Sequence, residues 1–124
     1  MSARKPDDLH HLFVTAFNES NMDAILALYE PEAALIPQPG QVTRGHTAIR
    51  HSLQQFLALN GTLKMKTVFI IHGPGVAMLR GQWQLDGVGP DGKPVEMVGQ
   101  SVEVARQQPT GEWLFAIDHP FGAD

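Results

Sequence analysis

Several features that would decide a function are missing from this chain of 124 residues. It contains no cysteine, which excludes a disulfide framework and thiolate chemistry. Its 9 basic residues are outnumbered by 13 acidic ones, for a net charge of −4, so we expect no nucleic-acid partner. No stretch approaches the ~20 apolar residues that cross a bilayer, and Met1–Pro6 precedes Asp7 and Asp8 rather than an apolar run. We therefore expect no signal peptide, no membrane partner and a cytoplasmic location.

The histidines do not form a recognisable metal site. His46 and His51 are five residues apart, and His10 and His11 are adjacent, so neither pair has the i, i+4 spacing of a helical zinc site. The sequence also has no glycine-rich phosphate loop and no serine in a nucleophile elbow. We therefore expect no metal and no cofactor.

The first half of the chain has helical spacing. Apolar residues make up 43 % of the sequence, and we interpret residues 1–124 as one domain. The spacing of Leu9, Phe13 and Phe17 predicts a helix over residues 6–20. Asn21 is placed to cap a second, short helix that Pro31 ends. A third helix is predicted from about residue 46 to residue 59.

The second half alternates as strands do. We predict a short strand at residues 33–36, broken at 37–40, and longer strands at about 64–71, 76–86, 95–107 and 112–119. Short turns join the last four strands, which favours an antiparallel meander. Helices followed by strands predict an α+β fold, with three N-terminal helices packed on one face of a curved antiparallel sheet.

Short motifs occur in a defined order along nearly the whole chain. They are Phe17-Asn18, Met22-Asp23-Ala24-Ile25, Leu28-Tyr29, Ala33-Ala34, Gly45, Ile49, Gly111-Glu112-Trp113 and Ile117-Asp118-His119. In this order the chain resembles the NTF2-like superfamily, and within it the SnoaL-like polyketide cyclases, the ketosteroid isomerases and the DUF4440-type proteins. The resemblance implies a cone, in which a bent antiparallel sheet wraps a long helix and leaves an apolar pocket. It also implies a homodimer through the outer sheet face, where we expect Trp113, Phe115 and Ile117.

The residues that carry steroid isomerisation are not retained. The resemblance places Phe13 where the isomerases have a tyrosine donor and Pro37 where they have the catalytic base. Their second oxyanion acid corresponds to Gln100. We therefore do not expect isomerisation of steroids by that mechanism.

Asp118 is the acid that the similarity to the cyclases retains. The cyclases carry a catalytic aspartate on the final strand, and counting from Gly111 places it at Asp118, although their neighbouring histidine is Ala116 here. Aspartate is disfavoured in strands. If Asp118 points into an apolar pocket, its charge must be hydrogen-bonded or its pKa must rise, which suits a general base. If it points outward, it is an ordinary solvated strand end.

Eight further side chains are candidates for contact with a ligand. Gln100 alternates with valines, so an inward Gln100 needs either a ligand or a neighbouring side chain as its partner. Trp83 and Tyr29 are expected to line the cavity. The resemblance implies an apolar lining completed by Phe13, Phe17, Pro37, Phe56 and Val98.

These residues support two hypotheses. In the first, the chain is a small-molecule pocket protein, a cofactor-independent isomerase or cyclase in which Asp118 takes a proton next to a carbonyl of a hydrophobic substrate. A polar group from Gln100, Tyr29 or Trp83 would then hydrogen-bond the enolate oxygen. In the second, the chain is a non-catalytic domain that binds a hydrophobic ligand or associates with a second copy.

Overall fold

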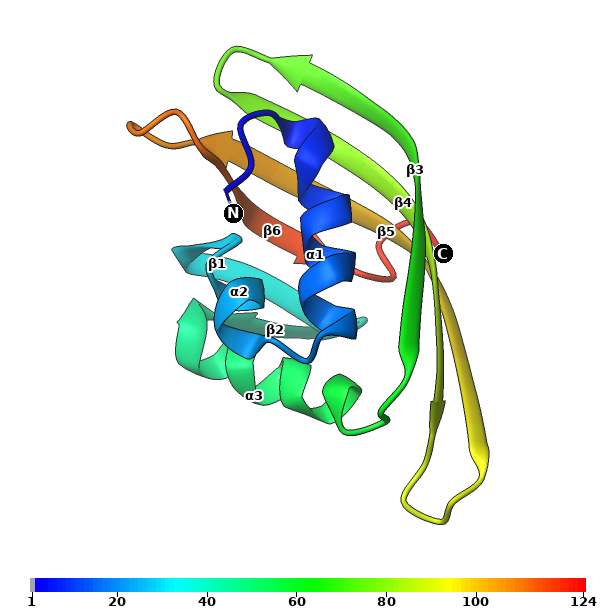
Figure 1. The fold of residues 1–124 in the computed structure, drawn as a ribbon. Helices are drawn as coiled ribbons and strands as arrows, with labels where there is room; N and C mark the ends of the chain where they lie inside the picture. The colour runs from blue at the N-terminus through cyan, green and yellow to red at the C-terminus, as the bar shows by residue number, and fades with distance from the viewer. Residues whose placement is uncertain (1) are drawn as a thin grey trace.

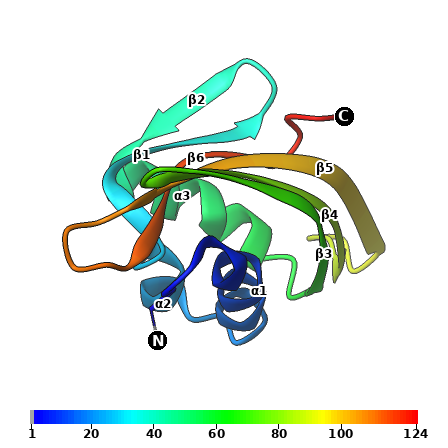
Figure 2. The same cartoon turned by 90° about the horizontal axis from the view of Figure 1, so that it is seen from above.

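The computed structural model describes residues 2–124 as three helices and a short 3-10 turn packed on one sheet. The helical segments are η1 (Pro6–Asp8), α1 (Leu9–Asn18), α2 (Met22–Leu26) and α3 (Gly45–Leu57). The strands are β1 (Tyr29–Gln38), β2 (Gln41–Arg44), β3 (Thr62–Gly73), β4 (Val76–Val88), β5 (Pro94–Gln107) and β6 (Trp113–His119). The predicted α+β class is confirmed, because the helices lie together against the concave face of a curved, unclosed sheet (Figures 1 and 2).

The helix boundaries follow from local chemistry. Asn21 caps α2, because its side-chain oxygen accepts a hydrogen bond from the backbone N–H of Ala24 at 3.1 Å. Asn60, just after α3, has a positive φ of 49°, a conformation that asparagine adopts more readily than most residues and that stops a helix. The apolar face of α1 packs against β3, and α3 packs against β1 and β2.

The sheet order is β2-β1-β6-β5-β4-β3. The antiparallel meander from β3 to β6 agrees with the prediction. Two features differ from it: β1 pairs with β6 in parallel, and β2 adds an antiparallel edge strand beyond β1. The turn at Pro39 and Gly40 closes this hairpin, so the residues that were predicted to break the first strand instead reverse it. The parallel pairing joins segments far apart in sequence, which local alternation does not reveal.

A bulge in β6 changes the faces of its side chains. Ala105 pairs with Phe115 and Val104 pairs with Ile117, so Ala116 is the extra residue. Because of this residue, Phe115 and Asp118 both face the helices, although strict alternation predicts opposite faces for them. The expected outer apolar face is corrected accordingly: Trp113 and Phe115 are buried, and only Ile117 of the three is exposed.

A row of other apolar side chains lies on the outer face of the sheet. Cross-strand neighbours Ile71 and Met78 are exposed there, and Met78 in turn pairs with Val104, which pairs with Ile117. None of the helices in residues 2–124 is both long enough and apolar enough to span a membrane.

Gly99 allows Trp83 to lie flat across β5, because a Cβ at residue 99 would collide with the indole ring. We predict that Gly99→Ala lowers the free energy of unfolding by about 1–3 kcal/mol, as overpacking of a fixed ring does. The ring cannot easily move aside, since its Nε1 donates to the carbonyl oxygen of Pro120 at 2.7 Å. Urea denaturation followed by tryptophan fluorescence measures the change. Val98→Ala, at the exposed neighbouring residue, is the control and should cost less than about 1 kcal/mol; equal losses would contradict this account.

Candidate functional site

A cavity of about 70 Å³ lies between the helices and the concave face of the sheet. Its walls are mostly apolar and include five aromatic rings: Phe13, Phe17, Phe56, Trp83 and Phe115. Its polar groups are His10, Ser101, Glu103 and Asp118. A few polar groups in an apolar hollow is the usual composition of a small-molecule site.

One face of α1 supplies part of this wall. His10, Phe13 and Phe17 recur at intervals of three and four residues, so their side chains project from the same side of the helix. The rings of Phe13 and Phe17 stack with their centroids 6.1 Å apart. Phe13 also meets Phe115 edge to face at 6.5 Å, which links the helix to β6.

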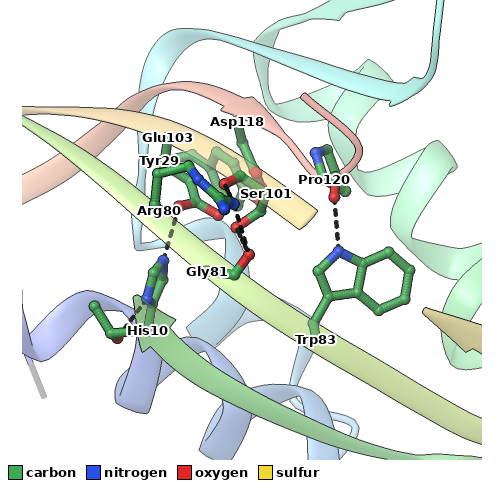
Figure 3. A network of polar contacts seen from close by, with 10 residues as sticks. His10, Tyr29, Arg80, Gly81, Trp83, Ser101, Glu103, Asp118 and Pro120 are labelled. Carbon is green, nitrogen blue, oxygen red and sulfur yellow. Dashed lines mark hydrogen bonds and ion pairs between the residues drawn. The ribbon is translucent and has the colours of Figure 1, made fainter. Parts of the chain in front are cut away.

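Asp118 points inward and is 6 % exposed. The hydroxyl of Tyr29, itself 1 % exposed, donates to Asp118 Oδ2 at 2.5 Å (Figure 3). Burial and the nearby charge of Glu103 raise the pKa of Asp118 from 3.8 to about 7, while the Tyr29 hydrogen bond and the charge of His10 act in the opposite direction. The carboxyl group therefore changes its charge close to neutral pH. Burial and the charge of Asp118 raise the pKa of Tyr29 well above its usual value, so Tyr29 keeps its proton and stays a hydrogen-bond donor.

Glu103 lies directly opposite Asp118 in the antiparallel pair of β5 and β6. It is 3 % exposed, and His10 Nε2 lies 2.8 Å from its Oε1. The other ring nitrogen of His10, Nδ1, is 2.7 Å from the hydroxyl of Thr67 on β3. A bond to a carboxylate on one side and a hydroxyl on the other fixes the imidazole ring against the sheet (Figure 3).

Gly81 on β4 provides the space for this arrangement. A Cβ at residue 81 would lie 2.8 Å from Ser101 Oγ and 3.1 Å from His10 Cε1, closer than side chains normally approach. Ser101 is 1 % exposed, and its hydroxyl has a long hydrogen bond of 3.4 Å to the carbonyl oxygen of Gly81. This weak bond leaves the Ser101 hydroxyl available to a ligand.

The structure places some of the sequence-based candidates around this cavity and others outside it. Phe13, Phe17, Phe56 and Trp83 line it with Asp118, and Tyr29 reaches it through its bond to Asp118. Three expected pocket residues lie elsewhere, namely Gln100, Val98 and Pro37.

The positions of Gln100 and Val98 correct the face assigned to β5. Val98 is 61 % exposed, and Gln100 accepts a hydrogen bond from Arg80 at 3.3 Å on the outer side. We expected the valine-rich face of β5 to point into the cavity. In the structure the small face, with Gly99 and Ser101, is inward because Trp83 and α1 fill that side. Pro37 lines a separate groove between the β1–β2 hairpin and α3.

Sequence reasoning missed His10, Ser101 and Glu103. A signal for His10 was present, because it shares a helical face with Phe13 and Phe17. Glu103 and Ser101 share a strand face by period two, but the sequence does not state which face is buried. Among residues 2–124, no group of three or more His, Asp or Glu side chains is arranged to hold a metal ion.

Comparison of the sequence with known families finds a match. The sequence profile described as "SnoaL-like domain" matches residues 11–108. No curated protein matches the chain in sequence.

Solved structures of similar shape share the fold at low identity. A ketosteroid isomerase-like protein from Erwinia carotovora atroseptica has a TM-score of 0.80 at 17 % identity, covering 91 % of this chain and 89 % of its own. A conserved protein from Planctomyces limnophilus has a TM-score of 0.83 at 15 % identity, covering 93 % and 91 %. A proposed dehydratase of the NTF2-like family from Streptomyces avermitilis has a TM-score of 0.73 at 16 % identity, covering 93 % of each chain.

The raised pKa of Asp118 predicts a specific pH dependence of stability. Between about pH 4 and pH 7 the folded protein keeps a proton on Asp118 that the unfolded chain has released. The free energy of unfolding therefore falls as the pH rises through this window, by up to about 1.4 kcal/mol per pH unit from this group, and levels off above it. Asp118→Asn removes this contribution. Urea denaturation from pH 4.5 to pH 8 should therefore show that the free energy of unfolding of the variant increases relative to that of the wild type as the pH rises. The exposed substitution Glu96→Gln should leave the wild-type slope unchanged, and a variant that tracks the wild type at every pH would show that Asp118 ionises normally.

Proposed function

The chain belongs to the SnoaL-like domain family, and from this premise we propose that it binds a compact hydrophobic carbonyl compound and that Asp118 transfers a proton at the adjacent carbon. The observation that carries the proposal is Asp118 itself. A carboxyl group with a pKa of about 7 in an apolar cavity can take a proton and return it at the same pH. In the proposed reaction Asp118 takes the proton as the C–H bond breaks, and the electron pair of that bond forms an enolate. Return of the proton from Asp118 to a different carbon of the enolate completes an isomerisation, whereas attack of the enolate carbon on a second carbonyl group of the substrate begins a cyclisation.

The developing enolate oxygen needs a hydrogen-bond donor. Gln100 is on the outer face, the Trp83 N–H is bound to Pro120, and the Tyr29 hydroxyl is bound to Asp118. Ser101 is the remaining hydroxyl on the wall, two residues from Glu103 along the same face of β5. Diagonal neighbours on a strand pair are spaced about 7 Å apart, so a single carbonyl compound can reach both Asp118 and Ser101.

The cavity volume favours a small substrate. Sites for drug-sized ligands are roughly 300–1,000 Å³, whereas this cavity holds about 70 Å³. We therefore infer a carbonyl compound of a few carbon atoms, or one of which only the reacting end enters.

We predict that the protein catalyses the exchange of hydrogen for solvent deuterium at the α-carbon of a small cyclic ketone. Proton NMR measures the rate of this exchange. The rate should rise with pH and level off above about pH 7, because the base must be ionised. Asp118→Asn should lower the rate about 100-fold or more, and Ser101→Ala about tenfold. Tyr29→Phe should move the midpoint to higher pH, since it removes a hydrogen bond that lowers the pKa of Asp118.

Gln100→Ala is the matched control on the same strand, since its side chain lies outside the cavity. It should change the exchange rate by less than about twofold. If the ketone binds but wild type and Asp118→Asn give the same exchange rate, the chain is a non-catalytic binder.

The outer sheet face favours an additional role in association. The cross-strand row of Ile71, Met78, Val104 and Ile117 leaves three large apolar side chains 43–57 % exposed, and contiguous exposed apolar surface marks contact sites. We propose that two copies of the chain pair through this face.

Sedimentation tests the pairing directly. Met78→Lys, in the middle of the row, should shift the wild-type dimer to monomer, because a buried unpaired charge opposes association. Val88→Lys replaces a similarly exposed side chain at the far end of β4 and should leave the dimer intact. A wild-type protein that sediments as a monomer at micromolar concentration would refute the pairing.

A further inference from the structure

In the proposed reaction neither His10 nor Glu103 exchanges a proton with the substrate. Both side chains are buried, with exposed fractions of 4 % and 3 %, and they meet at 2.8 Å in the cavity wall. Burying a carboxylate costs free energy that burying an apolar side chain of the same size would not. Glu103 Oε1 faces His10 Nε2, and no other side-chain hydrogen bond within residues 2–124 reaches the Glu103 carboxylate. The pair thus keeps a carboxylate in the cavity wall with one oxygen left for a ligand.

More acidic than basic side chains line the cavity. Two carboxyl groups, Glu103 and Asp118, face one histidine, His10, whose ring nitrogens are both occupied. Within residues 2–124, no lysine or arginine lines the cavity. Arg80, on β4, instead lies over the ring of Phe69 at 5.9 Å and donates to the carbonyl oxygen of Ser101. An anionic ligand would therefore add negative charge without a partner, whereas a cationic one would balance a carboxylate.

The rest of the wall also suits a cation. Five aromatic rings from α1, α3, β4 and β6 line the cavity. The faces of such rings attract ammonium groups, most strongly when water is excluded. Carboxylate oxygens and aromatic faces together are the chemistry that recognises a substituted ammonium.

We propose that the ligand of this cavity carries a positively charged nitrogen, and that the free oxygen of Glu103, positioned by His10, is its counter-ion. The inference rests on the proposed function for the identity of the site and adds to it a class of substrate, namely a compact amino-carbonyl compound. Asp118 then remains free for the carbon acid, while Glu103 orients the other end of the molecule. Glu103 is a substrate-binding residue in this scheme, and His10 is a positioning residue.

Three probes with the same branched carbon skeleton test the charge preference: isobutylamine, isobutanol and isobutyrate, each titrated at pH 8 and followed by amide chemical shifts of the wild-type protein. The amine should bind at least about tenfold more tightly than the alcohol, as a charge-assisted hydrogen bond provides, and isobutyrate should bind most weakly. An alcohol that binds as tightly as the amine, or an anion that binds better than either, would overturn the proposal.

Two glutamate substitutions on β5 then locate the effect. Glu103→Gln should bring the amine to within about threefold of the alcohol, whereas the exposed Glu96→Gln should retain the wild-type preference. The wild-type ranking decides the proposal even if Glu103→Gln does not fold. Because these measurements are of binding alone, they are independent of ketone exchange. A wild-type protein that catalyses ketone exchange but shows no preference for the amine refutes only the cation site. A wild-type protein that prefers the amine but catalyses no exchange refutes only the proton transfer.

Discussion

The hydrogen bond from Tyr29 to Asp118 is the interaction on which the site depends. Tyr29 begins β1, and Asp118 is the penultimate residue of β6. These strands pair in parallel, so the bond forms only when the sheet has its observed order. Neither residue would be stable there alone, since a phenol and a carboxyl group buried without partners each cost free energy. Together they place an acid of raised pKa at the base of an apolar hollow.

Two glycines and a bulge make room for the polar groups. Gly81 leaves space for His10 and Ser101, Gly99 leaves space for Trp83, and the extra residue Ala116 brings Phe115 and Asp118 onto one face. In each case a local departure from a regular strand is used to aim a side chain at the cavity. The regular helices and strands enclose the cavity, and these local departures place the side chains that line it.

Much of the architecture could be predicted from the sequence, and less of the site. The helices, the four-strand meander and the inward acid follow from periodicity, from Asn21 as a cap and from the resemblance of the motifs. The face of β5 could not be predicted, because the valine-rich face that includes Val98 is the more apolar one, and yet it points outward while Ser101 and Glu103 are buried. Periodicity identifies two faces of a strand but not which of them the helices cover. Glu103 was missed for the same reason, and Phe115 because a bulge leaves no trace in an alternation pattern.

The separation of 89 residues between Tyr29 and Asp118 has a consequence for how the protein reaches its native state. Closing so large a loop costs chain entropy before any contact compensates for it, and folds dominated by such distant pairings form slowly. The helices and the β3–β4 hairpin can form early from neighbouring residues. The contact between Tyr29 and Asp118, by contrast, spans most of the chain, so we expect it to form late in folding.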